Sequence, residues 1–276
     1  MQKRFLIPTV DNRIDELRKM LLSMQRYKSD WIFTIVAQAY TEADKQELRD
    51  FMAQLGFNAD LIFVDTGVGP ARARRIALME RTADVWISLD DDMVITKETH
   101  FNKMVDIVTS RPDIGLLSIN WAKTAEQVAQ KGTLEKLVKQ NIVYTGGGLA
   151  FRDDWAKMFL ATTEDRLWLF DNVAWSLASY VAGYDNYRYL GSSSVHRACA
   201  KGGRREWVYQ KSRVLPDQTL IRVRPACNNK RQMELGNCWH ICDSSDLTDK
   251  AKELHKIAKK ERERHAAEDK ADKRAD

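Results

Sequence analysis

The stretch VWISLDDD, residues 85–92, joins a short apolar run to three consecutive carboxylates. Such a run, bounded by polar residues, predicts a buried strand, so the acids stand where that strand ends. Like charges this close repel one another and need a cation or a hydrogen-bonded ligand. Oxygen ligands with open positions suit Mg²⁺ or Mn²⁺, ions that commonly bridge phosphates. The competing interpretation of Asp90, Asp91 and Asp92 is a solvated acidic turn.

Strands and helices alternate around this stretch through the first 120 residues. We predict strands at 4–8, 31–37, 61–64, 85–89 and 115–120, and helices at 11–27, 41–55, 71–82 and 97–110. The helix at 41–55 has Thr41 as its N-cap and Gly56 just past its end. The alternation predicts βαβ units in one α/β domain with a mostly parallel, Rossmann-like sheet. The carboxyl ends of its parallel strands meet at one edge, where ligands bind.

The pattern loosens after residue 120. We predict an amphipathic helix at 124–140, a glycine turn at 146–148 that precedes the apolar residues 149–151, and a helix at 171–182 ended by Gly183. Residues 247–276 are charged, with very few apolar positions, which predicts a solvated helix. We therefore divide the chain into a βαβ half (1–120), a second half of the same domain (121–200), a basic extension (201–246) and a charged helical tail (247–276).

Composition excludes several classes of protein. With 44% hydrophobic residues the chain can bury a core, so it is not a disordered protein. No apolar run approaches the ~20 residues that cross a bilayer, and the N-terminal apolar stretch is too short for a secretory signal. Four cysteines do not make a disulfide framework in a chain this long, which favours a soluble protein in the cytoplasm.

A cluster of cysteines near the C-terminus leaves two interpretations open. Its members are Cys227, Cys238, His240 and Cys242, with Cys199 upstream. Cysteine and histidine can hold zinc, but the spacing lacks a paired C-x-x-C. The alternative is a set of buried free thiols.

The excess positive charge lies in a single segment, residues 197–231, which we call the basic segment. It holds ten Lys/Arg and two acids (10 − 2 = +8), whereas the whole chain is +5. A localised patch of this kind indicates a polyanionic partner. Trp207 and Tyr209 lie among its basic residues, and this mixture can grip a nucleic-acid backbone and stack an exposed base. The alternative is a solvated basic loop packed by two aromatic side chains.

Five ordered features resemble the GT-A-type glycosyltransferases, close to the family-2 inverting enzymes, from about residue 4 to about residue 200. IPTVDNR (7–13) is similar to the opening strand and nucleotide-binding turn of the family, and GPARARR (69–75) is similar to its nucleotide-holding Gly-x-x-x-Ala-Arg-Asn segment. DDD (90–92) matches the DxD motif. GGG (146–148) with Phe151-Arg152 resembles the glycine-rich acceptor loop, and Asp171-Asn172 with AGY (182–184) resembles a Glu-Asp motif on a helix. Each feature is weak alone, but their order and spacing together are specific.

The resemblance implies a role for each matched residue. It implies that residues 1–120 bind the nucleotide sugar and that residues 121–200 form the acceptor and catalytic half. The implied donor is a nucleoside-diphosphate sugar, usually a uridine one, and the implied ion is Mn²⁺ or Mg²⁺. Asp171 would be the general base and Asp92 and His196 metal ligands. Residues that would hold the nucleotide sugar are Pro8, Thr9, Asn12, Arg13, Arg72, Arg74, Asp90, Asp91, Gly147 and Gly148. Without the resemblance, Asp171 is a helix N-cap and His196 a strand histidine with a satisfied hydrogen bond.

Three positions depart from the family pattern. Gln38, after Ala37, stands where an acidic pair usually reads the base, which leaves the choice of nucleotide open. Arg75 replaces the usual Asn, and Phe170 stands where a Glu precedes the base.

Three functions follow, in order of preference. The first is transfer of a sugar to a modified base in DNA, such as a hydroxymethyl pyrimidine, since the basic segment follows the catalytic region. Some virus-encoded proteins of this fold modify bases, so a phage origin and the host cytoplasm fit this interpretation. The second is a soluble transferase acting on a surface glycan, a lipid-linked sugar or a protein. The third is a non-catalytic nucleic-acid or carbohydrate-binding module, which the intact acidic motif disfavours.

Overall fold

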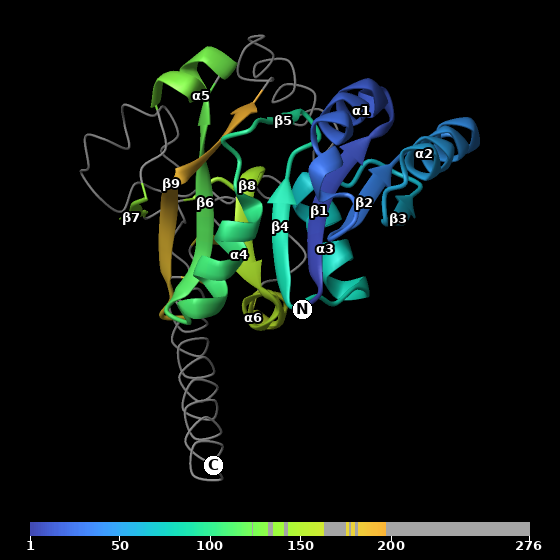
Figure 1. Ribbon diagram of the computed structural model, residues 1–276. Coiled ribbons are helices and arrows are strands. Elements are labelled where there is room, and N and C mark those ends of the chain that lie inside the picture. Colours follow the sequence, from blue (N-terminus) through green and yellow to red (C-terminus); the bar gives the residue numbers. More distant parts are fainter. Residues whose placement is uncertain are drawn as a thin grey trace, which may run out of the picture. The chain divides into compact units, whose positions relative to one another are not determined.

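The computed structural model describes residues 1–122, 124–131, 135–140, 143–162, 175–176, 178–179 and 182–196, all within one compact unit (Figure 1). The basic segment, the cysteine cluster, the C-terminal tail and Asp171 lie outside the described residues. Within them, no helix combines the length and the apolar character that crossing a membrane would require.

A nine-stranded sheet forms the centre of this unit (Figure 1). Its strands are β1 (Lys3–Val10), β2 (Ile32–Gln38), β3 (Ala59–Val64), β4 (Val85–Leu89), β5 (Met93–Ile95), β6 (Ile114–Ala122), β7 (Leu137–Lys139), β8 (Gly147–Arg152) and β9 (Asp185–His196). The order is β3-β2-β1-β4-β8-β6-β9-β5, and β7 also pairs with β9. The pairings make β1, β2, β3, β4, β6 and β9 run in one direction and β5, β7 and β8 in the other. The predicted mostly parallel α/β sheet is confirmed.

Helices cover both faces of the sheet. They are α1 (Ile14–Ser23), α2 (Glu42–Leu55), α3 (Pro70–Glu80), α4 (Phe101–Ser110), α5 (Ala125–Lys131) and α6 (Asp153–Thr162), with short 3-10 turns η1 (Asp11–Arg13) and η2 (Gln25–Tyr27). Alternate residues of a strand point to opposite faces. Phe5 and Ile7 accordingly pack with α1, α2 and α4, whereas Leu6 packs in the core of α3 and α6. The buried residues of β4 contribute to both cores.

The predicted ends of α2 are confirmed. Thr41 and Asp44 form a reciprocal capping box at its N-terminus, which satisfies backbone N–H groups that the first turn leaves without partners. Gly56 ends it in the left-handed region, with φ +68°.

The predicted helix at 124–140 is wrong in its second part. Helix α5 spans Ala125–Lys131, and residues 137–139 form β7 instead. Leu137 is in register with Tyr189 of β9, so long-range pairing replaces the helical pattern there. The helix predicted from residue 97 begins at Phe101, because the Thr99 side chain bonds the Thr96 N–H and the carbonyl of Ser193.

Candidate active site

The acidic motif, Asp90 to Asp92, lies at the carboxyl end of β4, beside the glycines 146–148, the last two of which begin β8. The Asp90 N–H donates to the Gly146 carbonyl at 2.7 Å. A Cβ on Gly146 would lie 1.9 Å from Asp90 Oδ2, so only glycine leaves room for this carboxylate. Gly148 has φ +103°, which also favours glycine. The predicted glycine turn is therefore part of the acidic site.

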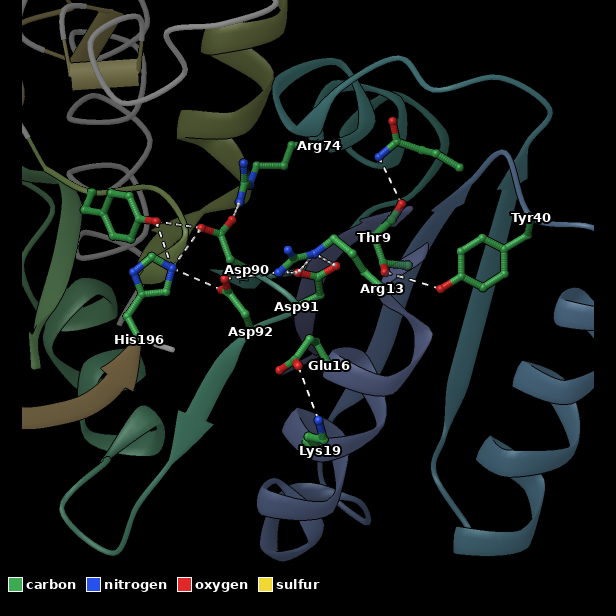
Figure 2. A network of polar contacts seen from close by, with 12 residues as sticks. Thr9, Arg13, Glu16, Lys19, Tyr40, Arg74, Asp90, Asp91, Asp92 and His196 are labelled. Carbon is green, nitrogen blue, oxygen red and sulfur yellow. Dashed lines mark hydrogen bonds and ion pairs between the residues drawn. The ribbon is translucent and has the colours of Figure 1, made fainter. Parts of the chain in front are cut away.

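His196 reaches the same place from the end of β9. Antiparallel pairing of β5 with β9 sets Met93 opposite His196, directly after the acidic motif. His196 Nε2 lies 3.0 Å from Asp92 Oδ1 and 3.9 Å from Asp90 Oδ2. The ligand atoms of Asp90, Asp92 and His196 all lie within 4.8 Å of one another, and we call these three residues the acidic triad. Figure 2 shows their side chains converging.

The acidic triad fits a divalent ion. Asp92 is 6% exposed, and its Oδ1 has no hydrogen bond from any described group. A buried oxygen without a hydrogen bond is costly unless a ligand compensates it. Two carboxylates suit Mg²⁺ or Mn²⁺, and neutral imidazole is a common metal ligand. The described residues therefore supply three donors of the right kind, with Asp92 Oδ1 lying 3.0 Å from His196 Nε2.

Tyr144 contacts two members of the acidic triad, although no sequence pattern predicts that it lies there. Its hydroxyl donates to Asp90 Oδ2 at 2.7 Å and lies 3.4 Å from His196 Nε2. Burial and the negative charge of Asp90 raise the pKa of the Tyr144 hydroxyl well above its usual value. It therefore remains a proton donor across the physiological pH range.

Arg74 contacts the acidic triad from α3. Its Nε donates to Ser88 Oγ at 2.8 Å, and its guanidinium pairs with the Asp90 carboxylate (Figure 2). Burial raises the pKa of Asp90, but the charges of Arg74 and His196 and the hydrogen bond from Tyr144 outweigh it and hold the pKa below its ordinary value. In the structure, Arg74 is thus the counter-ion of Asp90. Its predicted contact with the nucleotide stays a prediction.

The other two arginines of this segment lie differently. Arg72 is exposed on α3. Arg75, which replaces the usual Asn, donates to the Leu160 carbonyl of α6 at 3.2 Å, so it joins two helices.

Arg13 contacts the acidic motif from the other side. Its Nε lies 2.8 and 2.9 Å from the two oxygens of Asp91, and its Nη2 lies 3.1 Å from Asp92 Oδ2. Burial raises the pKa of Asp91 to about 6, against the opposing effect of Arg13. Figure 2 shows the Asp91 carboxylate beside Arg13, whereas His196 lies near Asp90 and Asp92. The middle acid of the motif is thus partnered within the protein.

Gln38, at the end of β2, forms hydrogen bonds with the backbone of β1 and with the backbone of the turn before α3. Its amide donates to the Thr9 carbonyl at 3.1 Å and accepts from the N–H groups of Val68 and Gly69 at 2.9 and 2.8 Å. The Thr9 hydroxyl lies 3.3 Å from Tyr40 Oη. Gln38, in the place of the family's acidic pair, is therefore bound to the backbone on both sides.

The remaining predicted donor residues lie nearby in the chain. Pro8 lies on β1, and Asn12 lies on η1, where its N–H donates to Asp11 Oδ1 at 2.7 Å. Gly147 and Gly148 begin β8 and are buried. Their contacts with a donor stay predictions, as does the role of Asp171.

Comparisons with known proteins agree with this geometry. The sequence profile described as "Glycosyl transferase family 2" matches residues 5–163. No curated protein sequence matches the chain.

Three solved structures illustrate the fold. TarS 1-349 of S. aureus has a TM-score of 0.55 at 14% identity, over 71% of this chain and 60% of TarS. GalNAc-T7 with UDP, GalNAc and Mn²⁺ has a TM-score of 0.57 at 12% identity, over 71% of this chain and 43% of that one. The mannosyltransferase PcManGT of Pyrobaculum calidifontis, with GDP-Man and Mn²⁺, has a TM-score of 0.55 at 14% identity, over 76% and 61%. This chain thus spans less than two thirds of each of these proteins.

Proposed function

Because the chain belongs to glycosyl transferase family 2, we propose that it transfers a sugar from a nucleoside-diphosphate sugar to a hydroxyl acceptor, with inversion at the anomeric carbon. The observation that carries the proposal is the acidic triad, which lies at the ligand-binding edge of the sheet. A uridine donor and Mn²⁺ are the favoured pair. One structural neighbour was solved with UDP and Mn²⁺ and another with GDP-Man and Mn²⁺, so the ion is common to both and the nucleotide is not.

The proposed reaction gives the chain's own residues distinct roles. A divalent ion bound by Asp90, Asp92 and His196 would neutralise the charge of the departing diphosphate. Arg74 and Tyr144 hold Asp90 from two sides, so the carboxylate is oriented before the donor arrives. Gly147 and Gly148 would let the sugar approach the backbone closely, since neither carries a Cβ.

The proton of the acceptor hydroxyl needs a base. A single displacement removes this proton as the oxygen attacks the anomeric carbon, and a carboxylate can accept it. Asp171 is the proposed base, because the motif that contains it resembles the Glu-Asp motif of the family.

The proposed acceptor is a hydroxymethylated pyrimidine in DNA. The support is the charge of the basic segment, +8 in 35 residues, directly after His196, together with Trp207 and Tyr209 within it. Arginine and lysine would bind phosphates, and an aromatic ring would stack an exposed base. The alternative acceptors are a surface glycan, a lipid-linked sugar or a protein.

One experiment tests donor, ion and acceptor together. The full chain is incubated with Mn²⁺, a panel of nucleotide sugars and hydroxymethylated DNA, and the DNA is digested to nucleosides for mass spectrometry. We expect one nucleoside to gain the mass of one sugar unit, a gain abolished by a chelator and restored by added Mn²⁺. Full transfer in excess chelator would refute the metal site. Release of nucleoside diphosphate without DNA modification would favour the alternative acceptors.

A further inference from the structure

We propose that Arg13 and Asp91 form a positioning pair that holds Asp92 in the orientation needed to bind the metal. The proposal rests on the proposed function, because it assigns Asp92 to a metal site. The three acids then have separate roles, since Asp90 and Asp92 face the ion and Asp91 anchors the arginine that orients Asp92.

The contacts run from η1 through Arg13 to both acids. Arg13 Nε reaches both Asp91 oxygens at 2.8 and 2.9 Å, and Nη2 lies 2.6 Å from Asp91 Oδ1. The same Nη2 lies 3.1 Å from Asp92 Oδ2. A planar guanidinium in a bidentate pair has little freedom, so Asp91 fixes the nitrogen that meets Asp92.

The two carboxylate oxygens of Asp92 therefore have different surroundings. Oδ2 is occupied by Arg13, whereas Oδ1 has no hydrogen bond from a described group and lies 3.0 Å from His196 Nε2. Fixing one oxygen of a carboxylate sets the direction of the other. The pair of Arg13 and Asp91 therefore keeps Asp92 Oδ1 directed at the other two members of the acidic triad before any ion is present.

Charge and burial favour this role over donor binding for Arg13. Its Nε and Nη2 already face carboxylates, and Asp91 and Asp92 are 4% and 6% exposed. Removing Arg13 from the pair to engage a phosphate would leave a buried carboxylate without its counter-ion, which is costly. Three acids against Arg13 and Arg74 leave a formal charge of −1 (−3 + 2) before His196 is counted, so the site can accept a cation without being strongly self-repelling.

Four variants test the pair. They are Asp91→Asn, Arg13→Gln, the double variant Arg13→Gln/Asp91→Asn, and the control Arg18→Gln. The control removes another partly exposed arginine–carboxylate pair, in which Arg18 of α1 contacts Glu47 of α2. Two quantities are measured on each full-length protein. One is Mn²⁺ affinity, from the electron paramagnetic resonance signal of free Mn²⁺, and the other is the midpoint of thermal unfolding.

We expect Asp91→Asn and Arg13→Gln each to weaken Mn²⁺ binding tenfold or more. The asparagine amide has only one acceptor oxygen, and a glutamine at residue 13 cannot reach both acids with a rigid fork. The double variant leaves no unpaired buried charge within the pair, so its unfolding midpoint should recover part of the loss. Its Mn²⁺ affinity should stay low, because Oδ2 of Asp92 still lacks its contact. Arg18→Gln should bind Mn²⁺ as the wild type does.

The outcomes separate this inference from the proposed function. If the wild type binds no Mn²⁺, the metal site itself fails. If the wild type binds Mn²⁺ and the two single variants match it, the positioning pair alone is refuted. Recovery of both stability and Mn²⁺ affinity in the double variant would make the pair a purely structural one and would also overturn the inference. UDP affinity without metal serves as a further readout: a loss in Arg13→Gln but not in Asp91→Asn would make Arg13 a donor ligand instead.

Discussion

The two halves of the described sheet are built on different principles. In the first, strands β1 to β4 are parallel, each is joined to the next by a helix, and the elements follow local sequence patterns. In the second, β8 is antiparallel to both β4 and β6, and β9 pairs with three strands, two of them antiparallel to it. Local patterning is sufficient for the first half, whereas long-range pairing determines the second.

The candidate site lies where the two halves meet. The first half supplies Asp90, Asp92 and the arginines that hold the acidic motif, and the second supplies Tyr144, Gly146 and His196. If residues of both halves form one metal site, a single substitution in either half should weaken Mn²⁺ binding and sugar transfer.

Asp92→Ala should have the largest effect and reduce transfer to the limit of detection, because the first half then loses the oxygen directed at His196. The fold should persist, because Arg13 keeps its contacts with both oxygens of Asp91 when the Asp92 carboxylate is removed. Transfer is measured by mass spectrometry of the product and folding by thermal unfolding. Asp106→Ala removes an exposed acid of α4 and should leave transfer unchanged, which makes it the control.

Asp171→Asn should lower transfer by ~10²–10⁴-fold, the usual share of general-base catalysis. The amide keeps the shape and the capping ability of the side chain but cannot take the proton. Mn²⁺ and nucleotide-sugar binding should persist, as measured by calorimetry, so this variant separates the base from the metal site. Near-normal turnover would assign the base to another residue, with Asp165 as the next candidate. The structure argues against Asp153 and Asp154, because they follow β8 beside the start of β4, whereas the acidic motif follows the end of β4.

Gly146→Ala tests the contribution of the second half to the position of Asp90. The added Cβ would overlap the Asp90 carboxylate, which is the movable end of a side chain, so we expect the carboxylate to shift and the fold to persist. Mn²⁺ affinity should fall by about tenfold, equivalent to ~1.4 kcal/mol. Gly67→Ala is the matched control, because a Cβ there meets nothing within 4 Å. Equal Mn²⁺ binding by the two variants would mean that Asp90 does not depend on the glycine turn.

The same division between the halves explains what the sequence can predict. Asp90, Asp91 and Asp92 are predictable at the end of a strand because an apolar run followed by acids is a local signal, and the caps of α2 are local too. The contact of Tyr144 with Asp90 spans 54 residues, and that of Arg13 with Asp91 spans 78. No periodicity carries information over such separations. His196 is identifiable only through the family resemblance. The strand at 137–139 is not predictable from its local sequence, because it forms by pairing with the distant strand β9.

The smallest expected effect concerns the basic segment, which follows the second half in the chain. If it binds a polyanionic strand, affinity for DNA should depend steeply on salt, with each neutralised phosphate adding ~0.7–0.9 to the log–log slope. Neutralising Arg204, Arg205 and Lys211 together should therefore lower the slope by up to ~2–3 units and raise the acceptor KM, while the donor KM barely moves. Trp207→Ala should weaken binding at an unchanged slope, because stacking is not an ionic interaction. The measurement is a titration of fluorescent hydroxymethylated DNA at several salt concentrations. A slope that the triple variant leaves unchanged would reject DNA as the acceptor while leaving the metal site, and the comparison between the two halves, intact.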